Sequence, residues 1–73
     1  MDLAARERLA ALKAWRGEVA KEHNLPAYVI FHDATLIAIA TQAPQTRGAL
    51  SGISGMGAKK LEAYGKEVLR LTA

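Results

Sequence analysis

The residues that could act as acids, bases, nucleophiles or metal ligands are few in this chain and widely spread. It contains two histidines, His23 and His32, and no cysteine. The histidines lack the paired spacing that a helical metal site needs. Ser54 lies among glycines, but the strand–turn–helix context of a hydrolase nucleophile is missing. The sequence therefore predicts a non-catalytic chain with no metal ion and no cofactor.

A glycine-rich segment carries a more specific signal. Residues 50–57 read Leu-Ser-Gly-Ile-Ser-Gly-Met-Gly, which is the layout of a helix–hairpin–helix turn. Such a turn directs backbone N–H groups outward at the positive end of a helix, where they can hold a phosphate oxygen without reading base sequence. Gly55 and Gly57 are the candidate donors, and Lys59 and Lys60 follow them. The alternative is that these glycines only allow a tight turn between packed helices.

The chain has a formal net charge of +3, and the whole excess of positive charge lies in its second half. Residues 1–33 contain five basic and five acidic residues, whereas residues 34–73 contain five basic and two acidic ones. At 100° per residue, Lys59, Lys66 and Arg70 share one face of the last predicted helix. This face is compatible with nucleic-acid binding and also with an ordinary solvated helix surface.

Tyr28 has two interpretations. Its position just after Pro26, at the start of a short predicted helix, could present the ring for stacking on a nucleobase. The ring could equally pack on the first helix, with its hydroxyl bonded to a carbonyl. The sequence leaves both alternatives open.

Five helices and no strand are predicted to position these residues. The periodicity of apolar residues predicts helices over residues 3–22, 26–31, 34–42, 47–51 and 58–71. Asp2, Asp33 and Thr46 are the expected caps of the first, third and fourth helices, and Pro26 suits the first position of the second.

The apolar faces of these helices predict one compact all-α bundle. The first helix has a face of Ala5, Leu9, Leu12, Val19 and Ala20, and the last has one of Leu61, Tyr64, Val68 and Leu71. The third helix is apolar nearly all round, which predicts a place in the middle of the bundle. The longest apolar runs are five residues, far short of a membrane span of about 20. We therefore expect residues 1–73 to form a single domain, excised from a larger enzyme.

Arg16 falls in the centre of the apolar face of the first helix. A buried guanidinium needs hydrogen-bonded partners, because an unpaired buried charge is prohibitively unfavourable. Asp33 and backbone carbonyls near Pro26 are the expected partners. We therefore predict that Arg16 and Asp33 have structural roles.

The ordered set of motifs resembles the helicase-and-RNase-D C-terminal (HRDC) domain over about residues 6–71. The motifs are Trp15-Arg16, the run Leu-Pro-Ala-Tyr-Val-Ile-Phe-His-Asp-Ala-Thr-Leu at 25–36, Pro44-x-Thr46 with Leu50, Gly55-x-Gly57-x-x-Lys60 and Tyr64-Gly65. The resemblance implies a five-helix bundle that follows a helicase or exonuclease core and binds nucleic acid or other domains. It also implies that the aromatic at Tyr28 and the basic residues near the glycine turn contact DNA.

Within this family, the chain is most similar to the HRDC domain of a bacterial RecQ-type DNA helicase. This resemblance implies a non-catalytic accessory domain that binds DNA weakly and without sequence preference. It would help select single-stranded or partial-duplex substrates in DNA repair or recombination. The candidate contacts are Tyr28, Gly55, Gly57, Lys59, Lys60, Lys66 and Arg70. We expect a cytoplasmic, nucleoid-associated setting, a monomeric isolated domain and no membrane partner.

Two alternatives remain. The chain could be a regulatory module that docks on its own helicase core or on a partner protein. The first helix favours this interpretation, because Glu7, Glu18 and Glu22 balance its basic residues. The chain could also be the RNA-binding accessory domain of an RNase D-type exonuclease, since backbone contacts do not distinguish DNA from RNA.

Overall fold

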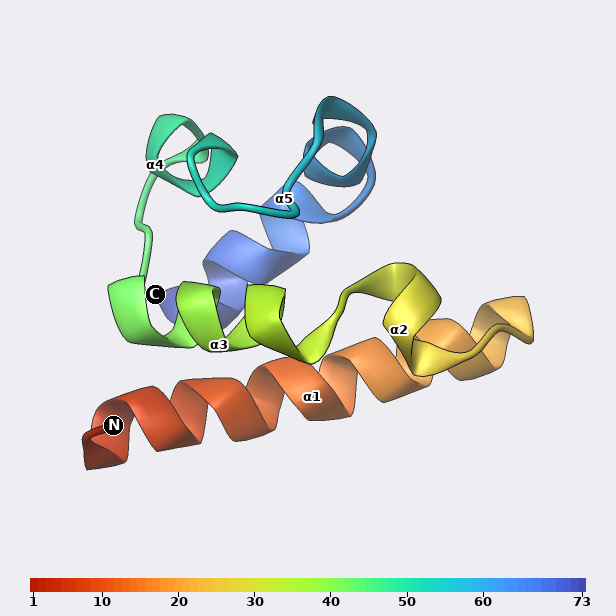
Figure 1. The fold of residues 1–73 in the computed structure, drawn as a ribbon, viewed down its shortest axis with the longest axis horizontal. Coiled ribbons are helices and arrows are strands. Elements are labelled where there is room, and N and C mark those ends of the chain that lie inside the picture. Colours follow the sequence, from red (N-terminus) through yellow and green to blue (C-terminus); the bar gives the residue numbers. More distant parts are fainter.

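Helices make up all the regular secondary structure of residues 1–73 in the computed structural model, as the sequence predicted (Figure 1). They are α1 (Leu3–His23), α2 (Ala27–Ile30), α3 (Asp33–Gln42), α4 (Arg47–Ser51) and α5 (Ala58–Thr72). Each boundary agrees with its predicted position to within one residue. None of the five helices combines the length and the hydrophobicity that a membrane span requires.

Two of the three predicted caps are confirmed, and one is wrong. Asp2 accepts a hydrogen bond from the Ala5 N–H at 2.7 Å, and Thr46 accepts one from the Ala49 N–H at 3.1 Å. Asp33 is instead the first residue of α3, and His32 is the N-cap without a side-chain bond. The physical reason is a competing partner, because the Asp33 carboxylate turns toward the Arg16 guanidinium.

Helices α1 and α3 lie side by side and run in opposite directions, while α4 packs on α5 and lies beyond α3 as seen from α1 (Figure 1). The antiparallel pairing appears in the contacts, because Arg8 Nε donates to the Ala40 carbonyl whereas Arg16 reaches Asp33. The end of α5 is fastened to the α3–α4 loop, where Thr72 Oγ1 donates to the Pro44 carbonyl at 2.8 Å.

The core runs between these helices and contains an aromatic cluster. Trp15, Phe31 and Tyr64 meet with ring centroids 5.6–6.1 Å apart, so that α1, the α2–α3 corner and α5 share one contact. The fully buried large side chains are Leu12, Ile30, Phe31, Leu36, Ile39, Leu50 and Val68. The central placement predicted for α3 is only partly correct, because Ile37 is 42% exposed. One face of α3 therefore meets solvent.

Candidate nucleic-acid interface

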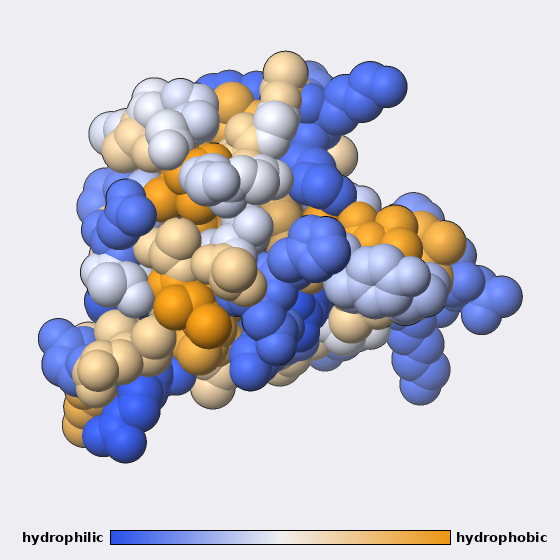
Figure 2. Space-filling model, in the orientation of Figure 1, coloured by the Kyte–Doolittle hydropathy of each residue, from blue (hydrophilic) through white to orange (hydrophobic).

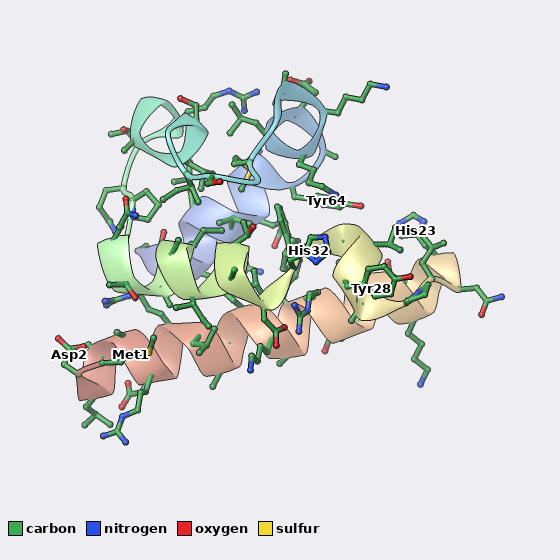
Figure 3. The ribbon with its side chains drawn as sticks, in the orientation of Figure 1. Met1, Asp2, His23, Tyr28, His32 and Tyr64 are labelled. Atoms are coloured by element: carbon green, nitrogen blue, oxygen red, sulfur yellow. The ribbon has the colours of Figure 1, made fainter.

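The α2–α3 corner presents an aromatic pair to solvent. Tyr28 is 61% exposed, and its ring stacks on that of His32 with centroids 5.9 Å apart and planes inclined by 29° (Figure 3). Its hydroxyl makes no hydrogen bond within the chain. Of the two interpretations of Tyr28, the structure therefore shows the exposed ring and not the ring packed on α1.

Apolar side chains surround this pair. Leu25 is 45% exposed and Val29 is 40% exposed. Figure 2 shows hydrophobic atoms at the surface over the α2 end of the molecule, on the right. The corner therefore offers a partly aromatic and partly apolar surface.

The glycine turn between α4 and α5 packs on the first turn of α3. Gly55 has φ = +91°, and a Cβ built there would collide with Oγ1 of Thr35. The same Thr35 hydroxyl donates to the Ser54 carbonyl at 3.2 Å. Gly55 is therefore required for the tight turn. The N–H groups of Gly55 and Gly57 nevertheless remain available to a ligand, because neither has a backbone or side-chain acceptor in the chain.

The first turn of α5 adds more free donors. Gly57 is its N-cap, and the first bonded amide is that of Leu61, which donates to the Gly57 carbonyl at 2.9 Å. The N–H groups of the three preceding residues, Ala58 to Lys60, therefore have no partner within the helix. No acidic side chain lies in this turn to neutralise the positive end of the helix. The glycine turn and the start of α5 thus form one positive surface of backbone donors.

The four candidate basic side chains of α5 are not equivalent. Lys59 and Lys66 are exposed and have no hydrogen-bond or ion-pair partner. Arg70 is exposed but bonded to Glu67, with Nη2 to Oε2 at 2.6 Å. Lys60 is only half-exposed, and its Nζ donates to the carbonyls of Val29 at 2.9 Å and Ile30 at 2.8 Å. Two of the four head groups are therefore free to meet a phosphate.

Arg16 lies beneath the same corner. Its Nη1 donates to the Phe31 carbonyl at 2.9 Å and lies 2.8 Å from Oδ1 of Asp33. The Arg16 side chain is 11% exposed and the Asp33 side chain 64%. The predicted acidic partner is thus found, and the carbonyl partner belongs to Phe31.

The glycine turn, the aromatic corner and the helical order can be compared with known proteins. The model of the HRDC domain family matches residues 5–72. The chain belongs to the HRDC family. The HRDC fold is also seen directly, because the solved structure of D. radiodurans RecQ HRDC domain 3 superposes with a TM-score of 0.88. That structure is 37% identical and matches 93% of this chain and 90% of its own.

Curated relatives of this HRDC domain are DNA helicases. The ATP-dependent DNA helicase UvrD2 of Mycobacterium tuberculosis is 57% identical over 65 residues, which is 89% of this chain and 9% of the relative. The ATP-dependent DNA helicase RecQ of Pasteurella multocida is 33% identical over 66 residues, or 90% of this chain and 10% of the relative. The HRDC domain therefore spans about a tenth of the length of these relatives.

Sequence reasoning missed two features of the corner. The contact of Tyr28 with His32 had no local signal, because the chain leaves α2 at Phe31 in an extended conformation before it reaches His32. The carbonyl bonds of Lys60 had none either, since they join residues 30 and 31 positions apart in the chain. Only the folded HRDC domain brings α5 to the end of α2.

The glycine turn allows a matched pair of substitutions. Gly55→Ala should lower the free energy of unfolding by about 1–3 kcal/mol, because alanine is strained at positive φ and its Cβ meets Thr35. Gly57→Ala should be nearly neutral, since φ is −68° and nothing lies within 4 Å. Urea denaturation of both variants measures the difference. Equal stability of the two would contradict this account of the turn.

Asp33 provides a pH-dependent prediction. The hydrogen bond and charge of Arg16 hold the pKa of the Asp33 carboxyl below its usual range, and Lys13 and His32 lower it further. Its contribution to stability is therefore complete above the unfolded pKa of about 3.9 and disappears as the pH falls through the lower folded pKa.

In Asp33→Asn this contribution is absent at every pH. The HRDC domain should consequently lose more stability than Asp33→Asn when urea melts at about pH 5 are compared with melts at about pH 2. Parallel losses in the two proteins would show that the ion pair contributes nothing.

Proposed function

We propose that this HRDC domain is a non-catalytic accessory domain of an ATP-dependent DNA helicase, in which it binds nucleic acid weakly and without sequence preference. One observation carries the proposal: the domain presents both an exposed aromatic stack and a surface of free backbone N–H groups. Lys60, in the first turn of α5, donates to the carbonyls of Val29 and Ile30 and so ties the start of α5 to the segment that carries Tyr28.

The two halves of this surface suit the two halves of a nucleotide. An exposed ring can stack on any base, which stabilises binding by about 1–3 kcal/mol per base without selecting a sequence. The donors of the glycine turn, with Lys59 and Lys66, can hold phosphate oxygens. Exposed bases are available in single strands, and we therefore propose single-stranded or partial-duplex DNA as the ligand.

The helicase context is supported by the relatives, whose printed names are ATP-dependent DNA helicases. We propose a helicase parent over an RNase D-type parent on this ground, together with a role in selecting DNA substrates for repair or recombination. The higher identity with UvrD2 than with RecQ favours a parent of the UvrD2 kind. We also propose that residues 1–73 form one domain within a longer helicase chain.

A second candidate function is docking on another domain of the same helicase or on a partner protein. The exposed Leu25 and Val29 beside Tyr28 favour it, because apolar surface is what a protein interface buries at its centre. This interaction would depend little on salt, whereas phosphate binding weakens steeply as salt rises.

The salt dependence of binding separates the two functions. Fluorescence anisotropy of a labelled short oligothymidylate should show weak binding at low salt, with a log–log slope of about −2 to −3. This slope corresponds to roughly three or four neutralised phosphates at about −0.7 each on a single strand. No binding at low salt, or a slope near zero, would overturn the nucleic-acid proposal and favour docking.

A further inference from the structure

Three successive carbonyls at the α2–α3 corner are each held by a cation from another helix. Lys60 of α5 donates to the carbonyls of Val29 and Ile30, at 2.9 and 2.8 Å. Arg16 of α1 donates to the next carbonyl, that of Phe31, at 2.9 Å. We call these two cations and three carbonyls the carbonyl clamp.

The backbone of α2 explains why a clamp forms here. This helix has four residues, and Phe31 leaves it in an extended conformation with φ = −152° and ψ = 142°. The last carbonyls of a helix receive no hydrogen bond from an N–H group of the same helix, and together they form its negative end. A cationic side chain is the favourable partner for such a group of carbonyls. Lys60 therefore supplies the hydrogen-bond donors that a further turn of α2 would otherwise supply to these carbonyls.

Most of the hydrogen-bonding capacity of the Lys60 head group is engaged in this role. An ammonium group has three donors, and two of them meet the carbonyls of Val29 and Ile30. The Nζ atom also lies 5.4 Å from the centre of the Phe31 ring, within the range of a cation–π interaction. Lys60 thus keeps one donor at most, whereas Lys59 next to it is exposed and unpartnered and is the better placed of the two to meet a phosphate.

We infer that Lys60 is a positioning residue, which holds the α2–α3 corner so that the Tyr28–His32 stack faces the ligand, and that it does not contact phosphate. The Tyr28 ring is attached to the segment that Lys60 holds, one residue before Val29. The inference rests on the proposed nucleic-acid function for its effect on affinity. The structural part of the inference, that the aromatic stack depends on Lys60, does not depend on ligand binding.

The test compares Lys60→Met with Lys59→Met, which remove the same charge from neighbouring positions. On the labelled oligothymidylate, Lys60→Met should weaken binding by about fivefold or more, as expected for an impaired stacking contact, with an unchanged salt slope. Lys59→Met should reduce the steepness of the slope by about 0.7, the contribution of one phosphate. In a Tyr28→Ala background, Lys60→Met should cause no further loss. A reduced slope in Lys60→Met, or an added loss in the Tyr28→Ala background, would overturn the inference.

A second measurement does not depend on binding. In NMR spectra of the free domain, contacts between the Tyr28 and His32 rings should weaken in Lys60→Met and persist in Lys59→Met. Persistence in both variants would contradict the positioning role even if the wild-type domain bound no oligothymidylate. If Lys60→Met fails to fold, Lys60→Gln, whose amide can still donate to a carbonyl, replaces it with the same outcomes in smaller measure.

Discussion

Arg16→Ala should lower the free energy of unfolding by about 2–4 kcal/mol, a large loss for a charged residue. The substitution leaves the Phe31 carbonyl without its donor and removes a buried side chain from between α1 and the α2–α3 corner. For a chain of this length, such a loss lowers the melting temperature by about 10–30 °C. Thermal unfolding followed by far-UV circular dichroism measures it.

Two control variants separate the causes of this loss. Arg6→Ala, an exposed position on the same helix, should stay within about 0.5 kcal/mol of the wild type. Arg16→Met keeps an apolar stem but no donor, and it should fall between the wild type and Arg16→Ala. An unchanged melting temperature in Arg16→Ala would show that the buried guanidinium does not hold the corner.

Reversing the charge at two positions of α5 should abolish binding of oligothymidylate even at low salt. Lys59→Glu with Lys66→Glu removes the two free ammonium groups of this surface and places carboxylates beside the exposed backbone donors. Both side chains face solvent and lack partners, so the fold should survive. Anisotropy titrations, with circular dichroism to verify folding, measure the loss.

A charge-matched control makes this test specific. Arg6→Glu with Lys21→Glu changes two exposed residues of α1 and produces the same formal net charge, from +3 to −1, since each reversal subtracts two charges. Its affinity should fall only modestly, through the weaker overall field. If the two double variants bound equally, net charge alone would govern binding and the α5 surface would have no special role.

Local features of the sequence predicted the helices well because their signals lie within a few residues. Asp2 and Thr46 each bond to an amide three residues later, so the cap and its helix are recognised together. The burial of Arg16 was also readable, because its angle on α1 is determined by the helical period alone. Such features need no knowledge of the tertiary fold.

The errors and omissions concern contacts between distant segments. Asp33 stands where a cap is expected, but Arg16, 17 positions earlier, attracts its carboxylate away from the helix end. Ile37 was predicted to be a core residue, but it lies on the one face of α3 that meets solvent. Lys60 looked like one more free cation in a basic helix, although its ammonium is used by the end of α2. Side-chain partners of this kind depend on the packed fold.

We propose that the glycine turn, the start of α5 and the α2–α3 corner form one nucleic-acid surface. A titration of the ¹⁵N-labelled domain with a short oligothymidylate at low salt, followed by amide and aromatic NMR shifts, tests this directly. The shifts should concentrate on the amides of Gly55, Gly57 and Lys59 and on the Tyr28 ring. Shifts confined to the outer face of α1, or none at all, would contradict this proposal.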